Sequence, residues 1–346
     1  MDKKRILATA VVFLILVALF YLQYRHWRSF DWSTFWSQTH RIRKRYVLQG
    51  IAYIYLGYWM RAWRWKIFLK PVRPKVTVGE MVPPTLVGFT GLALLGRAGE
   101  FIRPYLIARR TDLPVSSQVA VWGVERIFDL GAFTVLMMLA IFLPSALPSI
   151  PHPEYYLRFR EAGFFLTALV AGTTVAAIVI RKYGEQAAVW VEHRFSHLAS
   201  NLGHRLGERV REFGMGLNTI HGPLSLLSLT LVSVGMWYVI ALAYKEVTHS
   251  YGAASLDIPV SQLLILMFAS MLGSMLQLPA VGGGAQMATI ATLSSVFDAP
   301  PELAASCGIL LWLVTFAAVV PVGLLLAHHE RLSLRKLSVE SHKDVD

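Results

Sequence analysis

Residues 94–129 read LLGRAGEFIRPYLIARRTDLPVSSQVAVWGVERIFD, and this stretch decides the class of fold. Six charged side chains lie in or beside segments that are otherwise apolar enough to sit in a bilayer: Arg97, Glu100, Arg103, Glu125, Arg126 and Asp129. A charge at the centre of a membrane helix costs about 2.5–3.5 kcal/mol on insertion scales, so these groups cannot all face lipid. We expect them to pair with one another or to line a wet or ligand-filled cavity.

The composition agrees with a membrane setting. Of the 346 residues, 55% are hydrophobic and 16% are charged, whereas a soluble domain averages about 25% charged. Each membrane helix uses roughly 20 residues. The sequence therefore predicts an all-α polytopic membrane protein, a single integral-membrane domain over residues 1–346 with about seven to nine membrane segments.

The formal charge of +12 does not indicate a nucleic-acid partner, because Lys and Arg cluster at the ends of apolar runs. The positive-inside rule and anionic lipid headgroups explain that placement. The single cysteine, Cys307, provides no disulfide framework and no cysteine-based metal site. His193 and His197 are four residues apart but lack an HExxH pattern, so we expect no metal and no cofactor.

The two ends of the sequence predict an orientation. The basic sequence MDKKR precedes an apolar run at 6–24, which we interpret as a retained first span with a cytoplasmic N-terminus. A last span at 303–327 is followed by HHERLSLRK, which favours a cytoplasmic C-terminus and a polar tail at 331–346. We expect the protein in the plasma membrane, the bacterial cytoplasmic membrane being the setting we favour.

The second span, 46–69, carries RAWRWK near its end, where Arg61 and Arg64 share a helix face. Two interpretations remain open for this pair. The arginines could form an ordinary aromatic and basic anchor that snorkels to the interface, or they could contact a headgroup phosphate.

Two stretches predict broken or re-entrant elements. After Pro83 and Pro84, only twelve apolar residues precede Arg97, and twelve helical residues reach about 18 Å, too short for a core of about 30 Å. GRAGE would form the turn, with 101–108 returning. The second stretch, 277–286, places one Pro and three Gly in apolar sequence. It offers either an anion site or a packing hinge at Gly282, Gly283, Gly284 and Gln286.

Two further helices carry the remaining polar sequence. In the span that starts after Pro114, Glu125 and Asp129 are four residues apart and share a face, and either could belong to a static ion-pair network. Residues 183–221 show apolar residues at spacings of three and four, which predict one amphipathic helix lying on the anionic leaflet. Other spans are expected at 163–180, 224–244 and 258–276.

No nucleophile, P-loop or GxSxG motif is present, so we expect no enzymatic activity from this chain. Arginines with buried carboxylates beside a broken helix suit a cavity for a phosphate-bearing headgroup, bound through guanidinium contacts. The expected partners are a membrane phospholipid or lipid-linked substrate and anionic headgroups. An integral-membrane enzyme or enzyme subunit using Glu100 or Glu125 as a base, and a scaffold for a lipid-synthesising enzyme, stay open as alternatives.

The ordered motifs GRAGEFIR, VERIFD, RAWRW and LPAVGGGAQ resemble the lysylphosphatidylglycerol synthase transmembrane region, a flippase-like family, over about residues 5–330. The resemblance implies a polytopic lipid flippase-like module, which in the multiple-peptide-resistance-factor proteins moves aminoacylated phosphatidylglycerol between leaflets. A separate soluble domain makes that lipid, so aminoacyl transfer is not expected here. Family members often carry Glu where this chain has Gln286. The substrate could therefore equally be another anionic lipid or a polyprenyl-phosphate lipid.

Overall fold

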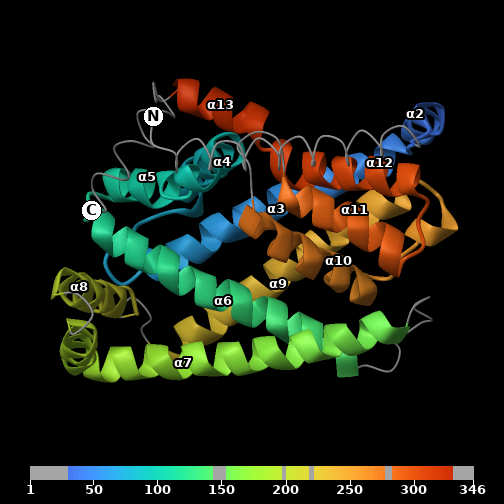
Figure 1. Ribbon diagram of the computed structural model, residues 1–346. Helices are drawn as coiled ribbons and strands as arrows, with labels where there is room; N and C mark the ends of the chain where they lie inside the picture. Colours follow the sequence, from blue (N-terminus) through green and yellow to red (C-terminus); the bar gives the residue numbers. More distant parts are fainter. Residues whose placement is uncertain (1–29, 143–152, 197–199, 218–221, 277–282, 330–346) are drawn as a thin grey trace, which may run out of the picture.

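The computed structural model describes residues 30–142, 153–196, 200–217, 222–276 and 283–329, and every regular element among them is a helix. The helices form one elongated bundle (Figure 1). The first span expected at 6–24 and the C-terminal tail at 331–346 lie outside the described residues. The all-helical prediction is confirmed for the part of the chain that is described.

Four helices in the described ranges are long and apolar enough to cross a membrane: Val78–Gly99, Leu157–Ser196, Gly222–His249 and Pro301–His329. The helix Val260–Gly273 is apolar but shorter. α3 (Lys44–Leu69) and α6 (Val115–Phe142) have 26 and 28 residues, yet they carry the charged side chains discussed below. A membrane protein is therefore confirmed, whereas the total of about seven to nine segments stays a prediction.

Long helices surround the centre of the bundle. α3 packs along α9 (Gly222–His249), and α6 packs against α9 as well. The beginning of α3 adjoins the end of α9, because the Arg43 guanidinium donates to the His249 carbonyl at 2.5 Å. α2 (Trp32–His40), capped by Asp31, packs on α12 (Pro301–Trp312). After a π-helical turn at Leu313–Ala317, α13 (Val320–His329) lies against α4.

The first predicted break forms a helical hairpin of α4 (Val78–Leu95), the 3₁₀ turn Gly96–Gly99 and α5 (Ile102–Thr111). The chain turns at Gly96, whose φ is 63°, a conformation that glycine adopts without strain. The predicted length of the first arm was wrong, because α4 begins at Val78 and contains both prolines. Its 18 residues reach about 27 Å. Thr77 caps the start of the helix, five residues before Pro83, because its hydroxyl accepts from the Glu80 N–H; the same hydroxyl donates to the Glu80 carboxylate.

The second predicted break also lies between two packed helices, α10 (Val260–Gly273) and α11 (Gly284–Val296). A 3₁₀ turn at Ser274–Leu276 follows α10, and residues 277–282, including Gly282, lie outside the described residues. Gly273 meets the Gly284 backbone so closely that no side chain fits between them. Whether either hairpin enters the membrane and returns to the same side stays a prediction.

The tips of the two hairpins meet. The α4–α5 hairpin lies toward the left of the bundle in Figure 1 and the α10–α11 hairpin toward the right. The Arg97 guanidinium in the first turn donates to the Met275 carbonyl in the second at 2.9 Å. Elements nearly 180 residues apart in sequence thus come together at an exposed contact.

The prediction of one amphipathic helix over 183–221 was wrong. α7 (Pro153–Ser196) continues through a kink at Tyr183, and a separate α8 (Ser200–Leu217) packs against it and against α6. The Glu192 carboxylate accepts from His204 across this contact at 2.9 Å and raises the pKa of His204. The apolar stripe of α8 is thus partly used within the chain, because the Phe213 ring lies against Gly123 of α6.

Candidate functional site

A buried ion-pair cluster joins three helices at the centre of the molecule. Arg64 of α3 donates to Glu125 at 2.5 Å and to Asp129 at 2.7 Å, and both carboxylates lie one turn apart on α6. Arg103 of α5 binds both oxygens of Glu125 in a fork. Ser233 of α9 accepts a further hydrogen bond from Arg64 at 2.9 Å. The side chains of Arg64 and Glu125 are fully buried, so this network is sealed from lipid.

Two more arginines approach the same carboxylates. Arg126 lies 3.3 Å from Glu125 and 3.3 Å from Asp129, and Arg61 lies 3.7 Å from Asp129. Four guanidinium groups therefore share two carboxylates, which leaves an excess of positive charge in the cluster. Three of the four arginines are buried, whereas the Arg126 side chain is 47% exposed, so the buried part holds one positive charge more than its two carboxylates. This buried excess favours an anion at the site.

The interfacial-anchor interpretation of RAWRWK was wrong for both arginines. Arg61 is 9% exposed and Arg64 is 0% exposed, so neither snorkels to the surface. Trp65, next to them, is also fully buried and lies 4.5 Å below the Arg103 guanidinium. The two acids one turn apart on α6 could have predicted that Arg61 and Arg64 are buried, because two buried carboxylates require cations from a neighbouring helix.

Arg97 and Glu100 lie apart from the ion pairs. Arg97 is exposed and makes the contact between the hairpin tips, so it is not a partner of the α6 carboxylates. Glu100 lines a small cavity of about 60 Å³ that Arg103 and Arg126 also line. The physical reason is the position of the turn, because Gly96–Gly99 directs Arg97 away from α6 and toward Met275.

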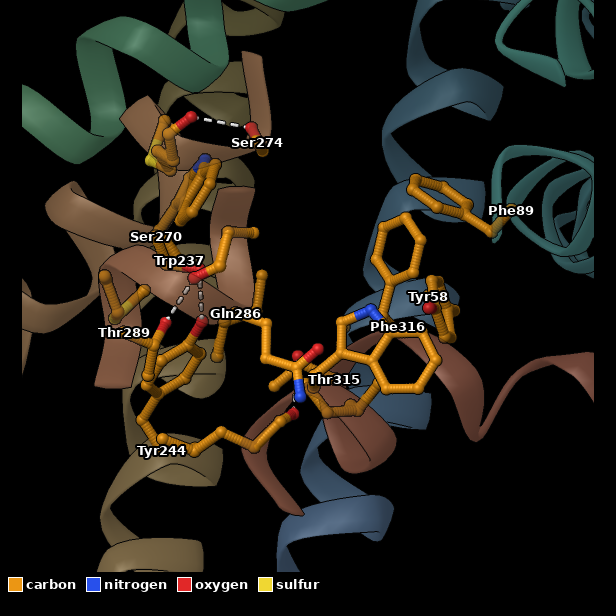
Figure 2. A pocket seen from close by; sticks show the side chains of 18 of the residues that line it. Tyr58, Phe89, Trp237, Tyr244, Ser270, Ser274, Gln286, Thr289, Thr315 and Phe316 are labelled. Carbon is orange, nitrogen blue, oxygen red and sulfur yellow. Dashed lines mark hydrogen bonds between the residues drawn. The ribbon is translucent and has the colours of Figure 1, made fainter. Parts of the chain in front are cut away.

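Next to the cluster lies a larger cavity of about 230 Å³ between α3, α9, α10, α11 and the π-helical turn (Figure 2). Arg61 and Phe89 line it from the side of the cluster, and Gln286 of α11 extends into it. Polar side chains are spread over its otherwise apolar walls: Tyr58, Tyr244, Ser270, Ser274, Thr289 and Thr315. The cavity therefore connects the positive cluster to the second hairpin.

Of the four predicted residues at the second break, Gln286 lines this cavity, while Gly283 and Gly284 start α11. Gly283 has φ 68°, and Gly284 packs on Gly273, which supports the packing-hinge interpretation for these two positions. Gly282 lies outside the described residues.

Arg61 differs from its neighbours in the cluster. Within the described residues its guanidinium makes no hydrogen bond. Its nearest carboxylate oxygen, Asp129 Oδ2 at 3.7 Å, accepts no hydrogen bond there either, whereas Arg64 and Trp237 both donate to Asp129 Oδ1. Arg61 otherwise lies over the Phe89 ring, 5.0 Å from its centroid. A guanidinium has five N–H donors, so Arg61 brings unused hydrogen-bond donors to the lining of the cavity.

Sequence reasoning missed the polar wall of the cavity, including Tyr58, Tyr244 and Thr315. These residues lie singly in apolar spans and carry no motif. The part of the chain that is described holds no group of three or more His, Cys, Asp and Glu side chains arranged for a metal ion.

A helical membrane bundle with a buried arginine and carboxylate cluster beside a cavity defines an integral-membrane protein with a charged site inside its bundle. More particularly, the chain belongs to the family described as the lysylphosphatidylglycerol synthase TM region, which it matches over residues 5–323. No curated protein and no solved structure matches the chain.

Proposed function

We propose that the protein is a lipid flippase that moves a phosphate-bearing polar lipid between leaflets, with the headgroup in the Arg61 cavity and the acyl chains in the bilayer. The observation that carries this proposal is the buried Arg61 guanidinium, which has no hydrogen bond among the described residues and lines the cavity. A planar guanidinium matches a phosphate through two parallel N–H···O bonds.

The rest of the cluster holds Arg61 in place and keeps it charged. Arg64 and Arg103 satisfy Glu125, so that carboxylate is not available to neutralise Arg61. Asp129 provides one long ion pair to Arg61, which orients the guanidinium without occupying its donors. An incoming phosphate replaces water at Arg61 and compensates part of the excess positive charge.

The position of the cavity also supports transport. Transporters with broken helices bind their substrates where the discontinuous elements meet near the middle of the membrane. Here the cavity lies between α3 and the second hairpin, and the Arg97–Met275 contact joins the two hairpin tips nearby. Movement of one hairpin against the other would open the cavity alternately to each side.

Reconstitution of the purified protein into liposomes tests this function. Fluorescent phosphatidylglycerol in the inner leaflet is protected from dithionite until it is moved outward, so the bleached fraction measures transport. We expect Arg61→Ala to lower the rate at least about tenfold, since loss of a charge-assisted contact corresponds to about 1.5–3 kcal/mol. Arg61→Lys should keep the charge but restore the rate only in part.

Arg205→Ala is the matched control, because Arg205 is exposed on α8, far along the chain from the cluster. It should leave the rate unchanged. An Arg61→Ala protein that folds and moves phosphatidylglycerol at the control rate would refute the assignment of Arg61. Absence of transport of any phosphate lipid by the wild-type protein would refute the flippase proposal itself.

A further inference from the structure

The lining of the cavity carries neutral polar groups besides Arg61. Gln286 extends into the cavity from α11 (Figure 2), and its amide has no hydrogen bond among the described residues. Tyr58 also reaches the cavity with its hydroxyl unbonded in that part of the chain. An amide and a phenol each donate and accept, so this lining can bind both kinds of hydrogen-bonding group.

Two threonines also line the cavity. The Thr289 hydroxyl donates to the Ala285 carbonyl at 2.8 Å, and the Thr315 hydroxyl donates to the Leu311 carbonyl at 2.7 Å. Both protons are used on backbone carbonyls. The Thr289 oxygen remains an acceptor toward the cavity, whereas the Thr315 hydroxyl also lies in hydrogen-bonding contact with Tyr244. A phosphate by itself accepts hydrogen bonds and cannot use such an acceptor. The matching ligand therefore carries its own N–H or O–H donors beyond the phosphate.

Charge decides between these two kinds of donor. Arg61 is the one ionisable side chain with a full charge that lines the cavity in the described chain, and no carboxylate lines it there. The nearest carboxylates, Glu125 and Asp129, are engaged by Arg64. An ammonium group in this cavity would lie near Arg61 with no counter-ion, whereas a hydroxyl would meet no repulsion.

Resting on the flippase function proposed above, we propose that the transported headgroup is a phosphate esterified to a small uncharged polyol, and that a cationic aminoacylated headgroup is selected against. Arg61 binds the phosphate, while Gln286 and the Thr289 oxygen bind the hydroxyls. The volume of about 230 Å³ lies below the roughly 300–1,000 Å³ of sites for drug-sized ligands, which fits a small headgroup.

The test compares three lipids in the same liposomes: phosphatidylglycerol, phosphatidic acid and lysyl-phosphatidylglycerol. We expect phosphatidylglycerol to move fastest and lysyl-phosphatidylglycerol to move at a rate at least about tenfold lower. One unfavourable close charge that costs about 1.4 kcal/mol produces a tenfold difference. Equal or faster movement of the lysyl lipid overturns this inference and leaves the flippase proposal intact. Absence of movement of all three lipids overturns both.

Two substitutions at Gln286 sharpen the result. Gln286→Glu adds the missing carboxylate, so it should raise the ratio of lysyl-phosphatidylglycerol to phosphatidylglycerol transport about tenfold. Gln286→Leu should lower the ratio of phosphatidylglycerol to phosphatidic acid transport, because phosphatidic acid has no polyol; an unchanged thermal unfolding midpoint shows that the variant is folded. Gln186→Glu, on the exposed surface of α7, is the matched control and should leave every ratio unchanged. A Gln286→Glu ratio equal to that of the control contradicts the assignment.

Discussion

At the scale of single residues, Glu125 is the group on which the buried charges depend. It accepts from Arg64 at 2.5 Å and from both terminal nitrogens of Arg103, and it is fully buried. A buried pair of this kind adds little stability compared with an apolar replacement, but loss of one partner leaves an uncompensated charge. The main effect of removing Glu125 is therefore to leave the buried Arg64 and Arg103 charges without a counter-ion.

We expect Glu125→Gln to lower the free energy of unfolding by about 3–5 kcal/mol, because Arg64 and Arg103 would lose their shared anion in a dry environment. The thermal unfolding midpoint of the purified protein in detergent measures this change. Glu208→Gln is the matched control, since the Glu208 side chain is 56% exposed on α8. Equal midpoints for the two variants would show that Arg64 and Arg103 find other counter-ions.

At the scale of elements, close backbone contact holds each hairpin together. A Cβ added to Gly99 would collide with the backbone of Gly91, and one added to Gly88 would collide with Arg103. The second hairpin has the same kind of close backbone contact, between Gly273 and Gly284. Small residues let helix backbones approach in a membrane, where van der Waals packing replaces the hydrophobic effect as a driving force.

Gly99→Ala should therefore destabilise the protein by about 1–3 kcal/mol, because the added methyl group meets backbone that cannot move aside. Gly172→Ala is the comparison, since a Cβ at this position of α7 meets nothing within 4 Å. That substitution should be neutral or should stabilise the helix by about 0.5–1 kcal/mol. Thermal unfolding of both variants measures the difference, and an unchanged midpoint for Gly99→Ala would refute the close-packed hairpin.

At the scale of the whole molecule, the ends of the bundle are far apart. The Arg43–His249 contact places the start of α3 beside the end of α9, and the 26 residues of α3 span about 39 Å. The loop after α3 and the loop after α9 therefore lie at opposite ends. Basic residues gather at the first of these ends: Lys70, Arg73, Lys75, Arg109 and Arg110.

The positive-inside rule then predicts that Lys75 faces the cytoplasm and Asp257 faces the other side. In intact cells, a membrane-impermeant maleimide should label Asp257→Cys, whereas Lys75→Cys should react only after permeabilisation. Both positions are exposed, and the native Cys307 is buried and provides an unreactive internal control. Labelling of both variants from the same side would contradict the orientation.

The sequence by itself determined the helical membrane class, the two breaks and the presence of charges that must be compensated. These follow from local composition, because apolar length, glycine turns and the cost of a charge in lipid need no tertiary information. It also placed Glu125 and Asp129 on one face through their spacing on a single helix.

Only the tertiary structure decided which charges meet. Arg64 of α3 became the main partner of the α6 carboxylates, and Arg97, from the opening stretch itself, turned toward Met275 instead. The hydroxyl and amide wall around Gln286 likewise comes from helices distant in sequence. Pairing between side chains of different helices depends on which helix faces pack together and on the direction of the turns. The periodicity of a single helix gives neither piece of information.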